Sequence, residues 1–157
     1  MKKVLLVLVL FGTLSCSSDD NKKEDSLSIV GNWKYVSANT YGVEQELTKC
    51  EKSLSYIELK TGTEVVEKSG LADVSSESGC KQTALTGTYA INDADQELIV
   101  TIYQDGKVFT KKNYFITELT NANLKLKIFK TSYFNSQSVW VEESLPEIKR
   151  TVYTYSK

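Results

Sequence analysis

The chain has 157 residues, of which 41% are hydrophobic and 25% charged, and its formal net charge is −1. Its Lys and Arg residues form no basic run, which argues against a nucleic-acid-binding protein. The sequence contains no histidine, so it lacks the usual general base of Ser or Cys catalysis and the usual imidazole ligand of catalytic zinc.

The first 16 residues have the order of an export signal. Two lysines are followed by an unbroken apolar run at residues 4–11 and by small residues that lead to Cys16. The apolar run is shorter than the roughly 20 residues that a bilayer-spanning helix needs. This order resembles a bacterial lipoprotein signal, in which the cysteine after the cleavage site carries lipid, although Leu14 stands two rather than three positions before it. We expect a signal peptide at residues 1–15 and lipidation of Cys16; ordinary secretion with an incidental cysteine is the alternative.

Residues 16–27 predict a flexible acidic tether, because no apolar residue occurs between Cys16 and Leu27. The run SSDD at residues 17–20 also resembles an acidic signal that some Gram-negative lineages use to send lipoproteins to the cell surface. A solvated linker would have the same composition. We therefore expect an outer membrane lipoprotein, held to the membrane by its lipid, and cell-surface exposure is the further interpretation of this run.

Residues 28–157 predict one all-β domain, with short polar connections between strands. Apolar and polar residues alternate most clearly in LKLKIFK, where Leu124, Leu126 and Ile128 would face inward. Short connections imply antiparallel neighbours, and closing the sheet into an up-and-down β-barrel would hide its edges. A β-sandwich is the alternative, and residues 69–83 are expected to form a loop. The predicted strands, eight or nine in the barrel, lie at 29–40, 53–60, 64–68, 86–91, 97–103, 108–119, 124–130, 138–143 and 149–155.

Two cysteines remain when Cys16 is assigned to lipidation. An exported chain most often pairs such cysteines, so we expect a disulfide between Cys50 and Cys80. In the chain-entropy description, this cross-link would stabilise the fold by about 3–4 kcal/mol. A two-thiol metal site is the alternative, but no histidine is present to complete it.

The segment GNWKYVS at residues 31–37 resembles the start of the lipocalin-like domain family of small bacterial lipoproteins. The ordered segments SLSYIELKTGT, GTYAI and YFITELTNANLKLKI, followed by a tyrosine-rich last strand, extend the resemblance over most of residues 28–155. It implies a lipocalin-like barrel that is open at one end. Gly31 would let the chain enter the first strand closely, and Trp33 would plug the closed end. In lipocalins an arginine often packs over that tryptophan, so Arg150, the only arginine, is expected to lie over Trp33.

Inward tyrosines near an open mouth would give an apolar wall that also carries hydroxyl groups. The protein is therefore expected to bind a small hydrophobic or amphipathic ligand, as a monomer, with no cofactor or metal and no enzymatic activity. Acidic pairs such as Glu142 and Glu143 are interpreted as solvated surface. Alternatively, large side chains fill the barrel and the protein contacts another envelope protein or a glycan through exposed aromatic residues of the segment 132–142, namely Tyr133, Phe134 and Trp140. The candidate ligand-binding residues are Tyr35, Tyr56, Tyr89, Ile102, Tyr114 and Tyr153.

Overall fold

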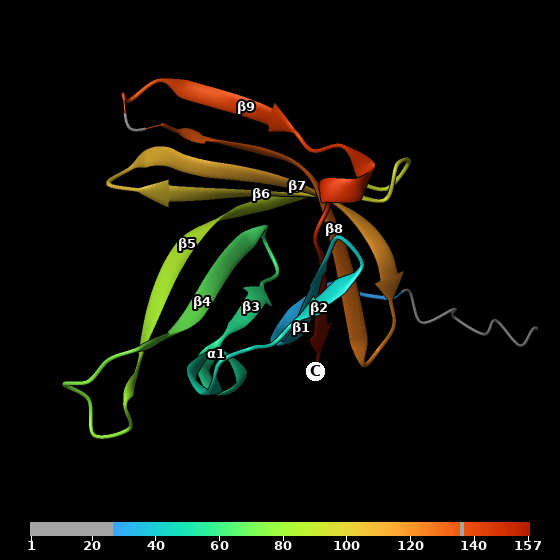
Figure 1. Cartoon of the computed structure of the whole chain (residues 1–157). Coiled ribbons are helices and arrows are strands. Elements are labelled where there is room, and N and C mark those ends of the chain that lie inside the picture. Colours follow the sequence, from blue (N-terminus) through green and yellow to red (C-terminus); the bar gives the residue numbers. More distant parts are fainter. Residues whose placement is uncertain (1–26, 136) are drawn as a thin grey trace, which may run out of the picture.

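The computed structural model describes residues 27–135 and 137–157, and strands make up most of this part of the chain (Figure 1). In this described part, two short helices, α1 (Lys49–Leu54) and η1 (Glu147–Lys149), interrupt the succession of strands. The strands are β1 (Gly31–Thr40), β2 (Val43–Gln45), β3 (Tyr56–Leu59), β4 (Glu64–Ala72), β5 (Cys80–Asn92), β6 (Glu97–Gln104), β7 (Lys107–Leu119), β8 (Asn123–Phe134), β9 (Trp140–Ser144) and β10 (Val152–Ser156).

The sheet closes on itself. Strands β1, β3, β4, β5, β6, β7 and β8 pair in that order, and every pairing is antiparallel. Strand β10 pairs with both β8 and β1, which completes a barrel of eight strands. The predicted all-β, antiparallel, lipocalin-like barrel is therefore confirmed. Strands β2 and β9 are additions, since β2 pairs with β1 and β9 pairs with β8.

Strands β9 and β10 lie along the same edge of β8, because they pair with its two halves in turn. Residues 146–150, which contain Pro146 and η1, leave this edge between them (Figure 1). The N–H of Leu145 donates to the carbonyl of Phe129 at 2.7 Å, and the N–H of Ile128 donates to that of Thr151 at 3.0 Å. Proline has no N–H to give to a ladder, so pairing is interrupted here and resumes at Val152.

Two local predictions need correction. Residues 69–83 were expected to form a loop, but β4 continues to Ala72 and β5 begins at Cys80, so the connection is only residues 73–79. The side chains of residues 69–72 and 80–83 are mostly small or polar and have little intrinsic preference for strands. These residues are strands because they pair with each other. Residues 53 and 54, expected in a strand, belong to α1, which begins with a capping box formed by Thr48 and Glu51.

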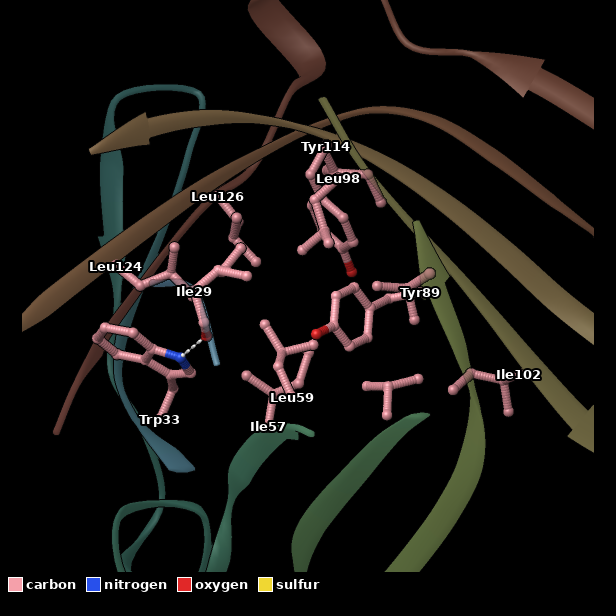
Figure 2. Close-up of a cluster of buried hydrophobic side chains, with 13 residues drawn as sticks. Ile29, Trp33, Ile57, Leu59, Tyr89, Leu98, Ile102, Tyr114, Leu124 and Leu126 are labelled. Atoms are coloured by element: carbon pink, nitrogen blue, oxygen red, sulfur yellow. Dashed lines mark hydrogen bonds between the residues drawn. The ribbon is translucent and has the colours of Figure 1, made fainter. Parts of the chain in front are cut away.

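Buried side chains fill the barrel from its closed end, and Figure 2 shows this cluster. Trp33 is fully buried there, and its Nε1 donates to the carbonyl of Ile29 at 2.7 Å, so its one polar atom is satisfied. Alternate residues of the central strands supply the rest of the cluster, as their period-two pattern predicts. Fully buried members are Leu59, Val65, Leu98, Val100, Ile102, Leu124 and Leu126.

The cation over the Trp33 ring is Lys157 and not Arg150. The Nζ of Lys157 lies 4.3 Å from the ring centroid and donates to the carbonyl of Val30 at 3.3 Å. Arg150 instead lies over Phe115, with its Cζ 5.6 Å from the ring centroid, and donates to the carbonyl of Leu145. The sequence prediction named Arg150 because an arginine takes this position in the lipocalin pattern. In the structure, Ser156 pairs with Lys34, and this register places Lys157 at the closed end.

Gly31, which was expected to let the chain enter β1 closely, lies next to the end of the Lys157 side chain. Its φ is +152°, and a Cβ placed there would lie 2.7 Å from Cε of Lys157. The absence of a side chain at position 31 therefore leaves room for the lysine stem that crosses the entry of β1 and reaches the Trp33 ring.

Candidate ligand site at the barrel mouth

A cavity of about 280 Å³ opens to solvent at the end of the barrel away from Trp33. Side chains from β1, β4, β7 and β10 line it, and α1 forms part of its rim. Four of its walls are tyrosine rings, contributed by Tyr35, Tyr114, Tyr153 and Tyr155. The interior is thus filled at one end and hollow at the other, so the barrel is neither packed throughout nor a continuous cavity.

The tyrosines form one connected cluster. The ring centroid of Tyr35 lies 6.2 Å from that of Tyr153 and 5.7 Å from that of Tyr155. Tyr114 meets Tyr153 edge to face, with the centroids 6.2 Å apart. A bulge in β1 between Tyr35 and Ser37 shifts the pairing with β10. Rings in contact at these distances support one another and form a preformed apolar wall.

Three of the six candidate ligand-binding residues, Tyr35, Tyr114 and Tyr153, meet inside this cavity. Tyr56 borders the cavity, but it precedes the inward-facing Ile57 on β3 and therefore faces outward, where Nζ of Lys68 lies 4.8 Å from its ring centroid. Tyr89 and Ile102 belong instead to the packed core, and the hydroxyl of Tyr89 donates to the carbonyl of Lys60 at 2.8 Å.

Tyr155 was missed by the sequence analysis, although it shares a face of β10 with Tyr153, two residues earlier. A polar pair was missed as well: Nζ of Lys112 lies 2.7 Å from Oε2 of Glu67. These residues come from β7 and β4, which are separated in the sheet by β5 and β6, so the ion pair crosses the interior of the barrel. Their side chains are only 29% and 17% exposed. The alternation of side chains along a strand could have identified both residues. Lys112 stands two residues before the buried Tyr114, and Glu67 stands two residues after the buried Val65, so both face inward.

The tyrosine hydroxyls stay protonated well above neutral pH. Burial raises the pKa of Tyr35 to about 12, with smaller contributions from Tyr153 and Glu51. Burial also raises the pKa of Tyr114 and of Tyr155 well above the ordinary value, and the negative charge of Glu67 adds to the effect. For Tyr153, burial raises the pKa while Lys112 opposes the increase. Each hydroxyl can therefore both donate and accept a hydrogen bond at physiological pH.

The rim helix α1 is fixed to the wall of the barrel by a disulfide, by hydrogen bonds and by a close backbone approach. The predicted disulfide between Cys50 and Cys80 is present, with the Cα atoms 5.5 Å apart, and it joins α1 to the start of β5. The Oγ of Ser55 accepts a hydrogen bond of 2.9 Å from the N–H of Gly70 in β4. A Cβ at Gly70 would lie 2.0 Å from the carbonyl oxygen of Cys50, so glycine is what permits the helix to approach.

The predicted aromatic segment forms the end of β8 and the start of β9, and its aromatic residues are partly exposed. Phe134 is 50% and Tyr133 38% exposed, and the ring of Phe134 lies 5.0 Å from that of Trp140, edge to face. Lys107 and Lys111 border a shallow groove beside this pair. The groove lies outside the barrel and is separate from the cavity at the mouth.

Several predictions concern residues that the structure does not describe. The signal peptide, Cys16 and the tether up to residue 26 lie outside the described part. Within residues 27–135 and 137–157, no group of three His, Cys, Asp or Glu side chains is placed to hold a metal ion. No helix in the same residues is long and apolar enough to cross a membrane.

Comparison with known families agrees with the architecture. The model of the lipocalin-like domain matches residues 29–126, more than half of the chain, from the segment before β1 into β8. Searches among curated proteins and solved structures found no match. The match stops before β9 and β10, so closure of the barrel by β10 is seen in the structure alone. The family is in general a binding fold rather than an enzyme fold, and with its eight-stranded barrel this chain belongs to the lipocalin-like domain family.

Proposed function

We propose that this protein is a lipid-anchored lipoprotein of the bacterial envelope that binds a small amphipathic molecule at the mouth of its barrel. The observation that carries the binding part is the solvent-open cavity of about 280 Å³ walled by four tyrosines. Ligand pockets commonly have volumes of about 300–1,000 Å³. The cavity is slightly smaller than the lower limit of that range, so the ligand is compact. Tyrosine rings supply apolar contact area and their hydroxyls supply polar contacts.

The binding proposal is tested on residues 17–157, which retain every strand and the disulfide that the structure describes. Native mass spectrometry of this chain, purified from its host without denaturant, is expected to show a bound small molecule. Tyr153→Leu, which removes a hydroxyl and an aromatic wall, should lose that adduct. Tyr103→Leu is the matched control, because Tyr103 is 39% exposed and does not border the mouth cavity. An unliganded spectrum combined with no binding of added small molecules would contradict the proposal.

The anchoring proposal depends on the order of residues around Cys16. The mature protein is expected to have a mass that includes lipid on Cys16 and to fractionate with the outer membrane. Cys16→Ser should abolish the lipid and retain the uncleaved precursor. Protease digestion of intact cells then tests surface exposure, because only an outward-facing domain is accessible. A mature protein with an unmodified Cys16 would show that the anchor does not exist.

A second function is favoured by the exposed aromatic pair on β9 and the end of β8. Phe134 and Trp140 lie beside Lys107 and Lys111 on the outside of the barrel, where an envelope protein or a glycan could make contact. Replacing both aromatic residues by serine should remove such an interaction and leave the mouth cavity unchanged. Pull-down from envelope extracts and glycan arrays, each comparing the native and doubly substituted chains, would detect the difference.

A further inference from the structure

The head group of the ligand can be inferred from the polar atoms inside the mouth, and this inference rests on the binding function proposed above. The Glu67–Lys112 pair has unused hydrogen-bonding capacity. An ammonium has three N–H donors and a carboxylate about four acceptor positions, yet each group has the other as its only partner within the described residues. The pair therefore presents both donors and acceptors to a ligand without having to separate.

The hydroxyls around the pair are also available. Within the described residues, no protein group forms a hydrogen bond with the hydroxyls of Tyr35, Tyr114 and Tyr155. In the same residues, the only buried side-chain polar atom without a partner is Oγ of Ser132, on another part of the sheet. Because these hydroxyls are not among the buried unpaired atoms, they open onto the cavity. Water can satisfy them there when no ligand is bound.

Charge balance limits what can replace that water. One carboxylate and one ammonium face the interior and neutralise each other. Glu51 at the rim accepts hydrogen bonds from Thr48 in the capping box, and Lys68 lies over the outer ring of Tyr56. The four charged side chains of the lining are two acidic and two basic, so a ligand with a single net charge would bury that charge in a site that has no net charge to balance it, which is costly. A hydrocarbon would strip water from the ion pair and the hydroxyls and give no hydrogen bond in return.

We propose that the cavity selects a compact ligand whose head group has no net charge and both donates and accepts hydrogen bonds, as a primary amide or a zwitterion does. In this assignment the Glu67–Lys112 pair is the specificity determinant. It holds the head group, while the tyrosine rings contact a small apolar body. The same pair makes the site a poor one for plain hydrocarbons, despite the apolar walls.

Five probes that share one ring test the assignment at pH 7: cyclohexanecarboxamide, 1-aminocyclohexanecarboxylic acid, methylcyclohexane, cyclohexylamine and cyclohexanecarboxylate. Binding to residues 17–157 is measured by ligand-observed NMR titration. The amide or the zwitterion is expected to bind at least about tenfold more tightly than the other three, as 1.4 kcal/mol of differential binding would give. If methylcyclohexane or a singly charged probe binds as tightly as the better of these two, the inference is overturned.

Substitutions in the ion pair should change the preference in a direction set by charge. Glu67→Gln leaves Lys112 without its counter-charge, so the carboxylate probe should gain about tenfold relative to the amide. Lys112→Met leaves Glu67 unpaired, so cyclohexylamine should gain instead. Glu142→Gln is the matched control, because it removes the acid of an ion pair with Lys130 on the outside of the barrel, where Nζ and Oε2 are 2.8 Å apart. It should leave the order of probes unchanged.

The double variant Glu67→Leu with Lys112→Leu should lose the preference for polar heads and bind methylcyclohexane more tightly than the native chain does. Circular dichroism and the disulfide content identify variants that have failed to fold. An unchanged order of probes in all folded ion-pair variants would overturn the role of the pair. If methylcyclohexane binds best and Tyr153→Leu abolishes that binding, the mouth is a ligand site but the head group assigned here is wrong. If no probe binds and no adduct is found, both proposals fail.

Discussion

The two ends of this barrel are built from different kinds of contact. At the closed end, Trp33 is fully buried, its single polar atom is satisfied, and a lysine stem covers it. At the mouth, an ion pair and several tyrosine hydroxyls surround open space. Burial of apolar area without unpaired polar atoms maximises stability, whereas groups with unused hydrogen bonds cost stability and provide binding capacity. The closed end therefore contributes most to stability, and the mouth keeps the polar groups that can bind a ligand.

The largest effect is expected from removing the plug of the closed end. Trp33→Ala leaves a cavity in the core and should lower the free energy of unfolding by about 3–5 kcal/mol. Denaturant titration measures this loss. Trp140→Ala serves as the control and should cost much less, because Trp140 is only partly buried at the edge of the sheet. If both variants lost the same free energy of unfolding, the closed end would not be the main source of stability.

Breaking the disulfide should have the next largest effect. The double variant Cys50→Ser with Cys80→Ser should lose about 3 kcal/mol of stability, since the bridge closes a loop of 30 residues in sequence separation. It should also weaken ligand binding, because α1 is part of the rim. Hydrogen exchange of α1 amides reports on the loosening separately from global unfolding. Unchanged exchange in α1 would show that the remaining contacts fix the helix by themselves.

Substitutions at two glycines can distinguish an effect on stability from an effect on ligand binding. Gly70→Ala and Gly87→Ala each place a Cβ 2.0 Å from a backbone oxygen, of Cys50 and Thr101 respectively, and each should cost about 1–3 kcal/mol. Only Gly70 lies under the rim helix, so only Gly70→Ala should also weaken binding at the mouth. Thermal unfolding and probe titration on the same two proteins measure both quantities. Equal effects on binding would mean that the rim helix does not shape the site.

The tyrosine cluster should make the protein less stable at alkaline pH. Because the pKa of Tyr35 is about 12 in the folded state and about 10 in the unfolded chain, the folded state binds the proton more strongly. The resulting stability is fully present below about pH 10 and is lost as the pH rises toward 12. Tyr35→Phe should reduce this slope, measured by denaturant titration at successive pH values. Tyr41→Phe, at an exposed position, should leave it unchanged.

The smallest effect concerns the cation at the closed end. Lys157→Met keeps most of the stem over Trp33 but removes the charge, so it should cost about 0.5–1 kcal/mol. Arg150→Met should leave the fluorescence of Trp33 unaltered, because Arg150 lies over Phe115. Both substitutions should leave probe binding unchanged. A fluorescence change on replacing Arg150 but not Lys157 would reverse the assignment of the cation.

Local pattern was sufficient for the strands with strong alternation. Leu124, Leu126 and Ile128 face inward as predicted, and QDGK forms the turn between β6 and β7. The disulfide was predictable because few cysteines remained to be paired. The extension of β4 and β5 was not, because their ends are rich in small polar residues and are strands only through pairing with each other.

The candidate site was predictable in part for a similar reason. Tyr114 and Tyr153 stand at inward positions that period two identifies, but the same rule places Tyr56 outward once Ile57 is known to be buried. The sequence analysis named Tyr56 as a ligand-binding candidate, because alternation alone does not say which face of a strand points inward. The phase of β3 was decided by its pairing with β1, where Ile57 lies opposite Trp33.

By itself, the sequence determined that this is an antiparallel, lipocalin-like β-domain with a paired Cys50 and Cys80, because alternation, turns and residue types act over short distances along the chain. Only the tertiary structure decided that Lys157 rather than Arg150 covers Trp33, and that Glu67 meets Lys112 across the barrel. The first contact joins strands from opposite ends of the chain, and the second joins strands that are not neighbours in the sheet. They depend on bulges, register and the curvature of the closed sheet, and no single segment carries that information.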